Sequence, residues 1–206
     1  MTQASEGSEC MKLLLGLLDK LGFIVVYGEA GAGKTSLALS VASQFKDDFL
    51  YLNTEGSPVG ERALQVLGSD FKGLFIDVDS LDSLILHLTE TISRMTPRLI
   101  VVDSINSVYR VEAAFDVDIA HTKFSLANAL LRWYCDRGVN ILCTAQVSGI
   151  EQVPAGMDVI RFYAGGLLRL RRTERGVRLL ESEDEKIIGR IIITEEGIKW
   201  LECTIS

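Results

Sequence analysis

The sequence predicts an α/β fold, with a mostly parallel sheet, helices on both faces and an antiparallel C-terminal extension. Two observations lead to this prediction. Short apolar runs typical of buried strands alternate along most of the chain with stretches that repeat apolar residues at helical spacing. After residue 146 the pattern changes to strands joined by short charged turns, which favours antiparallel pairing at one edge of the sheet.

The elements of the first half follow in order from these patterns. Leucines at 13, 14, 17, 18 and 21 mark an amphipathic helix, and an apolar run at 23–27 predicts a buried strand. A helix begins near Ser36, the next strand lies at 49–52, and Pro58 stands at a tolerated early position of a helix over 57–67. A strand at 74–78 precedes a helix over 80–95 with a clear apolar stripe.

In the second half, strands and helices alternate at first, and consecutive strands then follow. Buried strands are expected at 99–102 and 139–145, separated by a helix over 118–136. Strands are then expected at 167–172, 177–180 and 190–194, and the clearest turn between them is Thr173-Glu174-Arg175-Gly176.

Length and composition limit the class of protein. The 206 residues are 48% hydrophobic, which predicts one domain, 1–206, in which residues 1–10 are flexible. The net charge of −7 is not typical of a strong non-specific duplex binder, although a local basic strip remains compatible with it. No stretch is long and apolar enough to span a membrane, so we expect a soluble cytoplasmic protein.

The four cysteines form no CxxC pair and no metal-binding spacing. They stand at positions 10, 135, 143 and 203. We interpret them as small apolar residues of a protein in a reducing compartment.

Residues 28–35 read GEAGAGKT, the GxxxxGKT pattern that binds nucleotide phosphates. The pattern follows an expected strand and precedes an expected helix, so a glycine-rich turn is the weaker interpretation. Glycines let backbone N–H groups point at an anion, Lys34 can reach the β- and γ-phosphates, and the Thr35 hydroxyl can hold Mg²⁺. The expected nucleotide contacts are Gly28, Glu29, Ala30, Gly31, Ala32, Gly33, Lys34, Thr35 and Ser36.

Three polar residues follow other expected strands at the carboxyl edge of the sheet, where ligands bind in such folds. Asp103 is expected to hold Mg²⁺ through water, or else to cap the next segment. Glu55 is placed to orient or deprotonate the attacking water, or else is a solvated loop residue. Gln146 is placed to sense the γ-phosphate, or else is a polar strand end.

These motifs, in this order, resemble the RecA/RadA recombinase family, and in particular its archaeal RadA-type branch. The resemblance covers roughly residues 12–202 and includes four segments besides the P-loop. These read YLNTEG from Tyr51, VVDSINSVYR from Val101, TAQV from Thr144 and ITEEGI from Ile193. It implies a RecA-like ATPase core with ATP and Mg²⁺, Glu55 as the catalytic base and Gln146 as the sensor.

The chain also departs from the family pattern. No helix-hairpin-helix domain or docking F-x-x-A linker precedes Met11, and the F-x-x-A match at Phe124 lies in an expected core helix. The first DNA-binding loop is expected at 111–118, where it is acidic, and the second shrinks to about 147–154. Asn53 replaces the family's usual aspartate. The sequence therefore resembles a core-only paralogue of the RadB and RadC type.

Six arginines fall within eighteen residues, at 161, 169, 171, 172, 175 and 178. Arg169, Arg171, Arg172 and Arg175 are the candidate contacts to single-stranded DNA or to a neighbouring subunit's nucleotide. The alternative is a solvated hairpin whose arginines pair with acidic residues at 174, 181, 183 and 184.

The expected function is that of a slow ATPase that modulates homologous recombination and DNA repair. Single-stranded DNA and a full-length recombinase are the expected partners, and a homo-oligomer is compatible with the sequence although no N-terminal docking motif is present. The alternative functions are a regulatory ATPase that acts through protein contacts without nucleic acid, and a scaffold that binds nucleotide but barely hydrolyses it.

Overall fold

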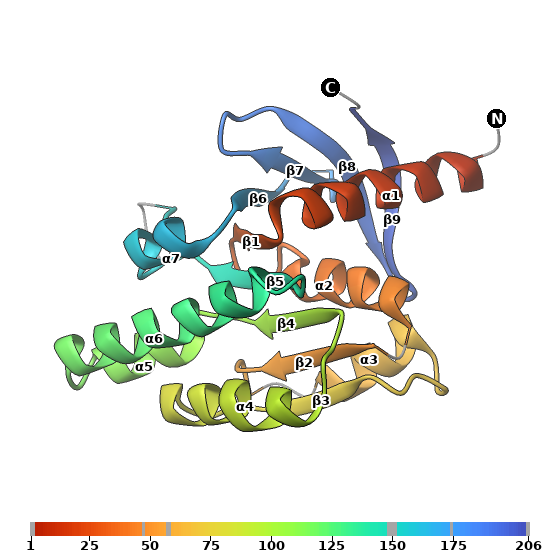
Figure 1. The fold of residues 1–206 in the computed structure, drawn as a ribbon. Helices are drawn as coiled ribbons and strands as arrows, with labels where there is room; N and C mark the ends of the chain where they lie inside the picture. The colour runs from red at the N-terminus through yellow and green to blue at the C-terminus, as the bar shows by residue number, and fades with distance from the viewer. Residues whose placement is uncertain (1–2, 47, 57–58, 148–151, 174, 205–206) are drawn as a thin grey trace.

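Nine strands form one sheet in the computed structural model, which describes residues 3–46, 48–56, 59–147, 152–173 and 175–204 (Figure 1). The strand order is β3-β2-β4-β5-β1-β6-β7-β8-β9. The strands are β1 (Phe23–Gly28), β2 (Phe49–Asn53), β3 (Leu74–Asp77), β4 (Leu99–Asp103), β5 (Asn140–Gln146), β6 (Gly166–Arg172), β7 (Arg178–Ser182), β8 (Ile187–Thr194) and β9 (Gly197–Cys203). The α/β fold class predicted from the sequence is confirmed.

Helices cover both faces of the sheet. One core lies beneath α4, α5, α6 and α7, and the other beneath α1, α2 and α3. The helices are α1 (Gln3–Leu21), α2 (Lys34–Ala42), α3 (Val59–Leu67), α4 (Leu81–Arg94), α5 (Ser107–Ala113), α6 (Val117–Cys135) and α7 (Met157–Tyr163), with a short 3₁₀ turn at Ser43–Phe45. Strand β1 shows the two-face arrangement directly, because Phe23 and Val25 enter one core while Ile24 and Val26 enter the other.

The parallel part of the sheet extends one strand further than the sequence suggests. Strand β6 pairs with β1 in parallel, and only β7, β8 and β9 continue the sheet by antiparallel pairing. The short helix α7 makes this possible, because it follows β5 and carries the chain back to the start of β6. A parallel neighbour needs such a crossover, whereas a tight turn joins only antiparallel strands.

One local prediction needs correction, and others stay predictions. Helix α1 begins at Gln3, and the flexibility predicted for residues 1–10 stays a prediction. The acidic stretch 111–118, expected as a loop, is largely the end of α5 and the start of α6, which Asp116 caps by accepting from the Ile119 amide at 3.0 Å. Residues 148–151 of the expected second loop, the helix start at 57–58 and Glu174 lie outside the described residues.

Phe124 behaves as its place in an expected core helix predicts. Its side chain is fully buried and stacks on Tyr109 with ring centroids 4.5 Å apart. The F-x-x-A match at this position is therefore core packing.

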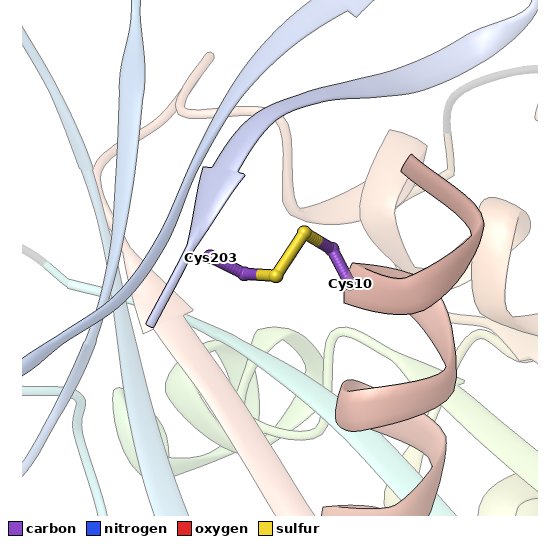
Figure 2. Close-up of a disulfide and its surroundings, with 2 residues drawn as sticks. All are labelled: Cys10 and Cys203. Carbon is purple, nitrogen blue, oxygen red and sulfur yellow. A yellow bond between two sulfur atoms is a disulfide. The ribbon is translucent and has the colours of Figure 1, made fainter. Parts of the chain in front are cut away.

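A disulfide joins Cys10 of α1 to Cys203 of β9, which corrects the interpretation of these two cysteines as reduced apolar residues (Figure 2). Their Cα atoms lie 5.5 Å apart although 193 residues separate them in the chain. Sequence spacing gives no sign of this pairing because it depends on α1 packing against β9. Cys135 and Cys143 are free, and burial raises the pKa of both thiols.

Within the described residues, no helix combines the length and the apolar character that crossing a membrane requires.

Candidate functional site

Four neighbouring strands end at one edge of the sheet, and the predicted site residues stand at or just beyond these ends. Gly28 at the end of β1 lies beside Gln146 at the end of β5, and Asn53 of β2 lies beside Asp103 of β4. A pocket of about 310 Å³ opens there. Its lining residues are Ala30, Gly31, Gly33, Lys34, Thr35, Ser36, Glu55, Gln146, Arg178 and Ile193.

The P-loop backbone requires glycine at Gly33. Its φ is 100°, in the left-handed region, and an added Cβ would lie 2.5 Å from Cδ1 of Ile193 on β8. Helix α2 begins immediately afterwards, so its unpaired N–H groups and positive dipole end face the pocket. These are the properties that a phosphate site needs.

Lys34 lies against the loop rather than in solvent. Its side chain is only 7% exposed, and Nζ donates to the carbonyl oxygens of Gly28 and Glu29, each at 2.9 Å. Burial lowers the pKa of Lys34, while the nearby carboxylates of Glu55 and Asp103 act to raise it. The lysine therefore brings its positive charge to the floor of the pocket within reach of two acidic groups.

Asp103 is buried beneath the pocket and does not line it. One carboxylate oxygen accepts from the Tyr51 hydroxyl at 2.7 Å and the other accepts from the Thr144 hydroxyl. Burial, followed by the influence of Asp103, raises the pKa of Tyr51 well above its ordinary value, so this hydroxyl remains a donor. Two donors thus fix the carboxylate in one orientation at the end of β4.

Glu55 stands two residues beyond β2 with an exposed side chain that lines the pocket. Its backbone amide donates to Oδ1 of Asn53 at 3.3 Å, and Nδ2 of Asn53 donates to Oδ1 of Asp77 at 2.7 Å. An aspartate at position 53 would present a carboxylate to Asp77 in place of this donor. The structure therefore gives a local reason for asparagine here, namely the acidic neighbour on β3.

Gln146 lines the pocket at the end of β5 and is held through its backbone by Asn106. The Asn106 amide donates to the Gln146 carbonyl at 2.9 Å, and its oxygen accepts from the Gln146 N–H at 3.0 Å. Asn106 is fully buried. These two hydrogen bonds hold the backbone of Gln146 in place, and its side chain makes none of them and can line the pocket.

The supporting residues Tyr51, Thr144 and Asn106 were not identified from the sequence. Tyr51 and Thr144 could have been recognised, because each is a hydroxyl-bearing residue in a mostly apolar strand. Both strands pair with β4, which ends in Asp103. Asn106 carried a weaker signal as a buried amide just after a strand.

Arg178 of β7 was grouped in the sequence with the other arginines, but the structure places it in the pocket. Its Nε donates to the Ala32 carbonyl of the P-loop at 3.0 Å, and its guanidinium also donates to the Gly176 carbonyl. Burial, and then the neighbouring charge of Arg172, lowers its pKa without removing its charge. No local pattern marks this residue, because 146 positions separate it from Ala32.

The candidate strip of arginines does not act as one group. Arg171 pairs with Glu181 at 2.8 Å, and Arg161 pairs with Glu183 at 3.2 Å. Arg172 and Arg175 are exposed, and together with Arg171 and Thr173 they line a hollow of about 370 Å³. The alternative of acid pairing thus applies to Arg171 and Arg161, and an exposed cationic surface remains around Arg172 and Arg175.

Arg169 belongs to a chain of contacts that reaches the P-loop. It donates to Oε1 of Gln152 at 3.1 Å, and Nε2 of Gln152 donates to Oε1 of Glu29 at 3.0 Å. Gln152 lies six residues after Gln146, so these contacts join the P-loop to the part of the chain that follows β5.

Comparisons with known proteins agree with this geometry. Residues 18–146 match the family model described as AAA domain. The chain is 29% identical to the DNA repair protein RadA of Treponema pallidum over 96% of its own length, but it spans only 44% of that protein. It is 28% identical to the DNA repair and recombination protein RadB of Methanosphaera stadtmanae, covering 79% of this chain and 78% of the relative.

A further relative covers most of both chains. The DNA repair and recombination protein RadB of Archaeoglobus fulgidus is 33% identical over 184 residues, which are 81% of this chain and 82% of that protein. Together with the P-loop at the end of β1 and the ordered strand ends around it, these matches show that the chain belongs to the RadA/RadB branch of the RecA-like P-loop family.

Proposed function

We propose that this protein binds ATP with Mg²⁺ in the P-loop pocket, hydrolyses it slowly, and acts in DNA repair and recombination. The observation that best supports the proposal is the gathering of Lys34, Thr35, Glu55 and Gln146 around one pocket, although they come from three separate parts of the chain. The names of the RadA and RadB relatives supply the biological role.

The residues present fit a magnesium ion. The Thr35 hydroxyl and the Asp103 carboxylate offer hard oxygen donors, and few protein ligands are needed because nucleotide phosphates and water complete the shell. When bound, the ion neutralises charge on the phosphates. Asp103 already accepts from Tyr51 and Thr144, so we assign it to hold the ion through water rather than directly.

The remaining pocket residues divide the work of phosphoryl transfer. The α2 N-terminus and Lys34 bind and orient the phosphates, and Glu55 orients the attacking water and accepts its proton. Gln146 hydrogen-bonds the γ-phosphate, while Asn106 keeps its backbone in place. Arg178 adds a second positive charge to the pocket from β7 and fixes the Ala32 carbonyl.

The assignment of DNA as a partner rests on a smaller set of residues. Arg172 and Arg175 supply exposed positive charge for phosphates of a single strand. Separately, the contacts from Arg169 through Gln152 to Glu29 tie β6 to the P-loop. A full-length recombinase is the other partner that fits the relatives' names.

The proposal is tested by single-turnover hydrolysis of ATP with and without Mg²⁺, repeated with single-stranded DNA at two salt concentrations. We expect Mg²⁺-dependent hydrolysis and DNA binding that weakens as salt rises. Absence of hydrolysis in every condition would reject the enzymatic part.

A regulatory ATPase that acts through protein contacts is the second candidate. Two observations favour it: the acidic residues Glu112, Asp116 and Asp118 stand where the family's first DNA loop is expected, and Glu181 pairs with Arg171. ATP hydrolysis without DNA binding at low salt would select this function.

A further inference from the structure

Helix α6 is apolar on two opposite sides. One side carries Ala120, Phe124 and Leu131, which are completely buried in the core. The other carries Ile119, Leu126 and Trp133, whose exposed fractions are 54%, 49% and 47%. A surface helix usually turns charged and polar residues outward. The guanidinium of Arg137 lies 3.4 Å from the centroid of the Trp133 ring, so this chain covers part of the stripe itself, while Ile119 and Leu126 stay exposed.

The outer stripe has the spacing of a helix–helix seam. Ile119, Leu126 and Trp133 are seven residues apart, and Thr122 and Ala129 stand between them, which gives alternating steps of three and four residues. A shallow hollow of about 380 Å³ runs alongside, between α6 and Thr89 of α4. Leu86, one turn before Thr89, is 49% exposed and widens the apolar surface.

The stripe is symmetric about its centre. Leu126 lies seven residues from Ile119 and seven from Trp133, so an antiparallel copy of α6 would place Leu126 on Leu126 and Ile119 on Trp133. A contact in which the same patch meets itself is the usual basis of a two-fold dimer.

Charge at the two ends of α6 also favours antiparallel pairing. Asp116 and Asp118 make the start of the helix acidic. Arg132 in its last turn and Arg137 just beyond it make this end net basic, although Asp136 pairs with Arg132 at 2.9 Å and Arg137 lies over the Trp133 ring. Antiparallel packing brings the acidic end of one helix to the basic end of the other, and it also aligns opposite ends of the helix dipoles.

We propose that the outer stripe of α6 is the interface for a second copy of this chain, packed antiparallel about a two-fold axis at Leu126. None of the stripe residues lines the nucleotide pocket. The dimer therefore leaves each pocket free of direct contact from this interface, and ATP binding and dimerisation can be measured independently.

Sedimentation equilibrium over a range of concentrations provides the first test. The wild type should dimerise, and Leu126→Asp should shift its dimer dissociation constant upward by at least a hundredfold. Leu64→Asp is the matched control, because Leu64 is a similarly exposed leucine (53%) on α3. A wild type that stays monomeric at high concentration, or an equal effect of both variants, would overturn the proposal.

Trp133 provides an optical readout of the same event. The chain has two tryptophans, and Trp200→Phe leaves Trp133 as the sole tryptophan, which can be excited selectively over the five tyrosines. Its emission should move to shorter wavelength as protein concentration rises, and this shift should vanish when Leu126→Asp is added. An emission maximum independent of concentration would contradict burial of the stripe.

Cross-linking through introduced cysteines tests the direction of packing. Leu126→Cys should form a disulfide-linked dimer under mild oxidation, whereas Ile119→Cys should link only when mixed with Trp133→Cys. Efficient self-linking of Ile119→Cys would indicate parallel packing and would reject the antiparallel arrangement. Failure of all three to link would reject a second copy as the occupant of the stripe.

Discussion

Glu55 is the residue whose proposed role as the catalytic base can be tested most cleanly. It lines the pocket, yet its side chain is exposed, so the fold does not depend on it. Glu55→Gln should retain ATP binding but slow single-turnover hydrolysis about a hundredfold, because an amide cannot accept the proton of the attacking water. Glu61→Gln, an exposed substitution of the same type on α3, should hydrolyse ATP at the wild-type rate. Equal rates in Glu55→Gln and wild type would show that Glu55 is not the catalytic base.

Substitution of Asn53 tests whether its hydrogen bond to Asp77 stabilises the fold. Asn53→Asp should lower the free energy of unfolding by about 1 kcal/mol, because it removes the donor to Asp77 and sets two carboxylates together. Adding Asp77→Asn should recover most of that stability, since the pair can then share a hydrogen bond again. Urea denaturation of the two single variants and the double variant measures the coupling. Additive effects would show that the two side chains do not interact.

At the scale of elements, the disulfide ties the first helix to the last strand. Closing a loop of this length stabilises the fold by about 5 kcal/mol in the chain-entropy model. The double variant Cys10→Ser/Cys203→Ser should therefore melt well below the oxidised wild type, and dithiothreitol should lower the melting temperature of the wild type only. Thiol titration in denaturant should find two free thiols before reduction and four after it. Four thiols in the unreduced protein would contradict the cross-link.

The hairpin of β6 and β7 carries the candidate DNA surface. Arg172→Glu/Arg175→Glu should weaken binding to single-stranded DNA and reduce the salt dependence by roughly 0.7 in log–log slope for each phosphate that the variant no longer neutralises. These two positions are preferable to Arg171, whose reversal would also break its pair with Glu181. Lys12→Glu/Lys199→Glu changes the net charge equally on α1 and β9 and should have a smaller effect. An unchanged slope in the arginine variant would exclude this surface.

At the scale of the whole molecule, the sequence predicted those features that depend on a residue's own helix or strand. The P-loop motif and the apolar runs located β1, α2 and the strand ends that carry Asp103 and Gln146, because strand ends in a parallel sheet share one edge. Contacts between distant segments were not predictable in this way. Arg178 reaches Ala32, and Cys10 reaches Cys203, only after the antiparallel extension has folded onto α1 and the P-loop.

Binding of ATP at the P-loop is the central claim, and thermal stabilisation by Mg²⁺–ATP tests it most directly. At about a hundred times the dissociation constant, ligand should stabilise the wild type by roughly 2.7 kcal/mol, or about 5–10 °C in melting temperature for a chain of this length. Lys34→Ala should fold, losing only the bonds to the Gly28 and Glu29 carbonyls, and should show no ligand-induced shift. Lys199→Ala, at an exposed position of β9, should shift like the wild type. A full shift in Lys34→Ala would contradict binding at the P-loop, and no shift in the wild type would contradict ATP binding itself.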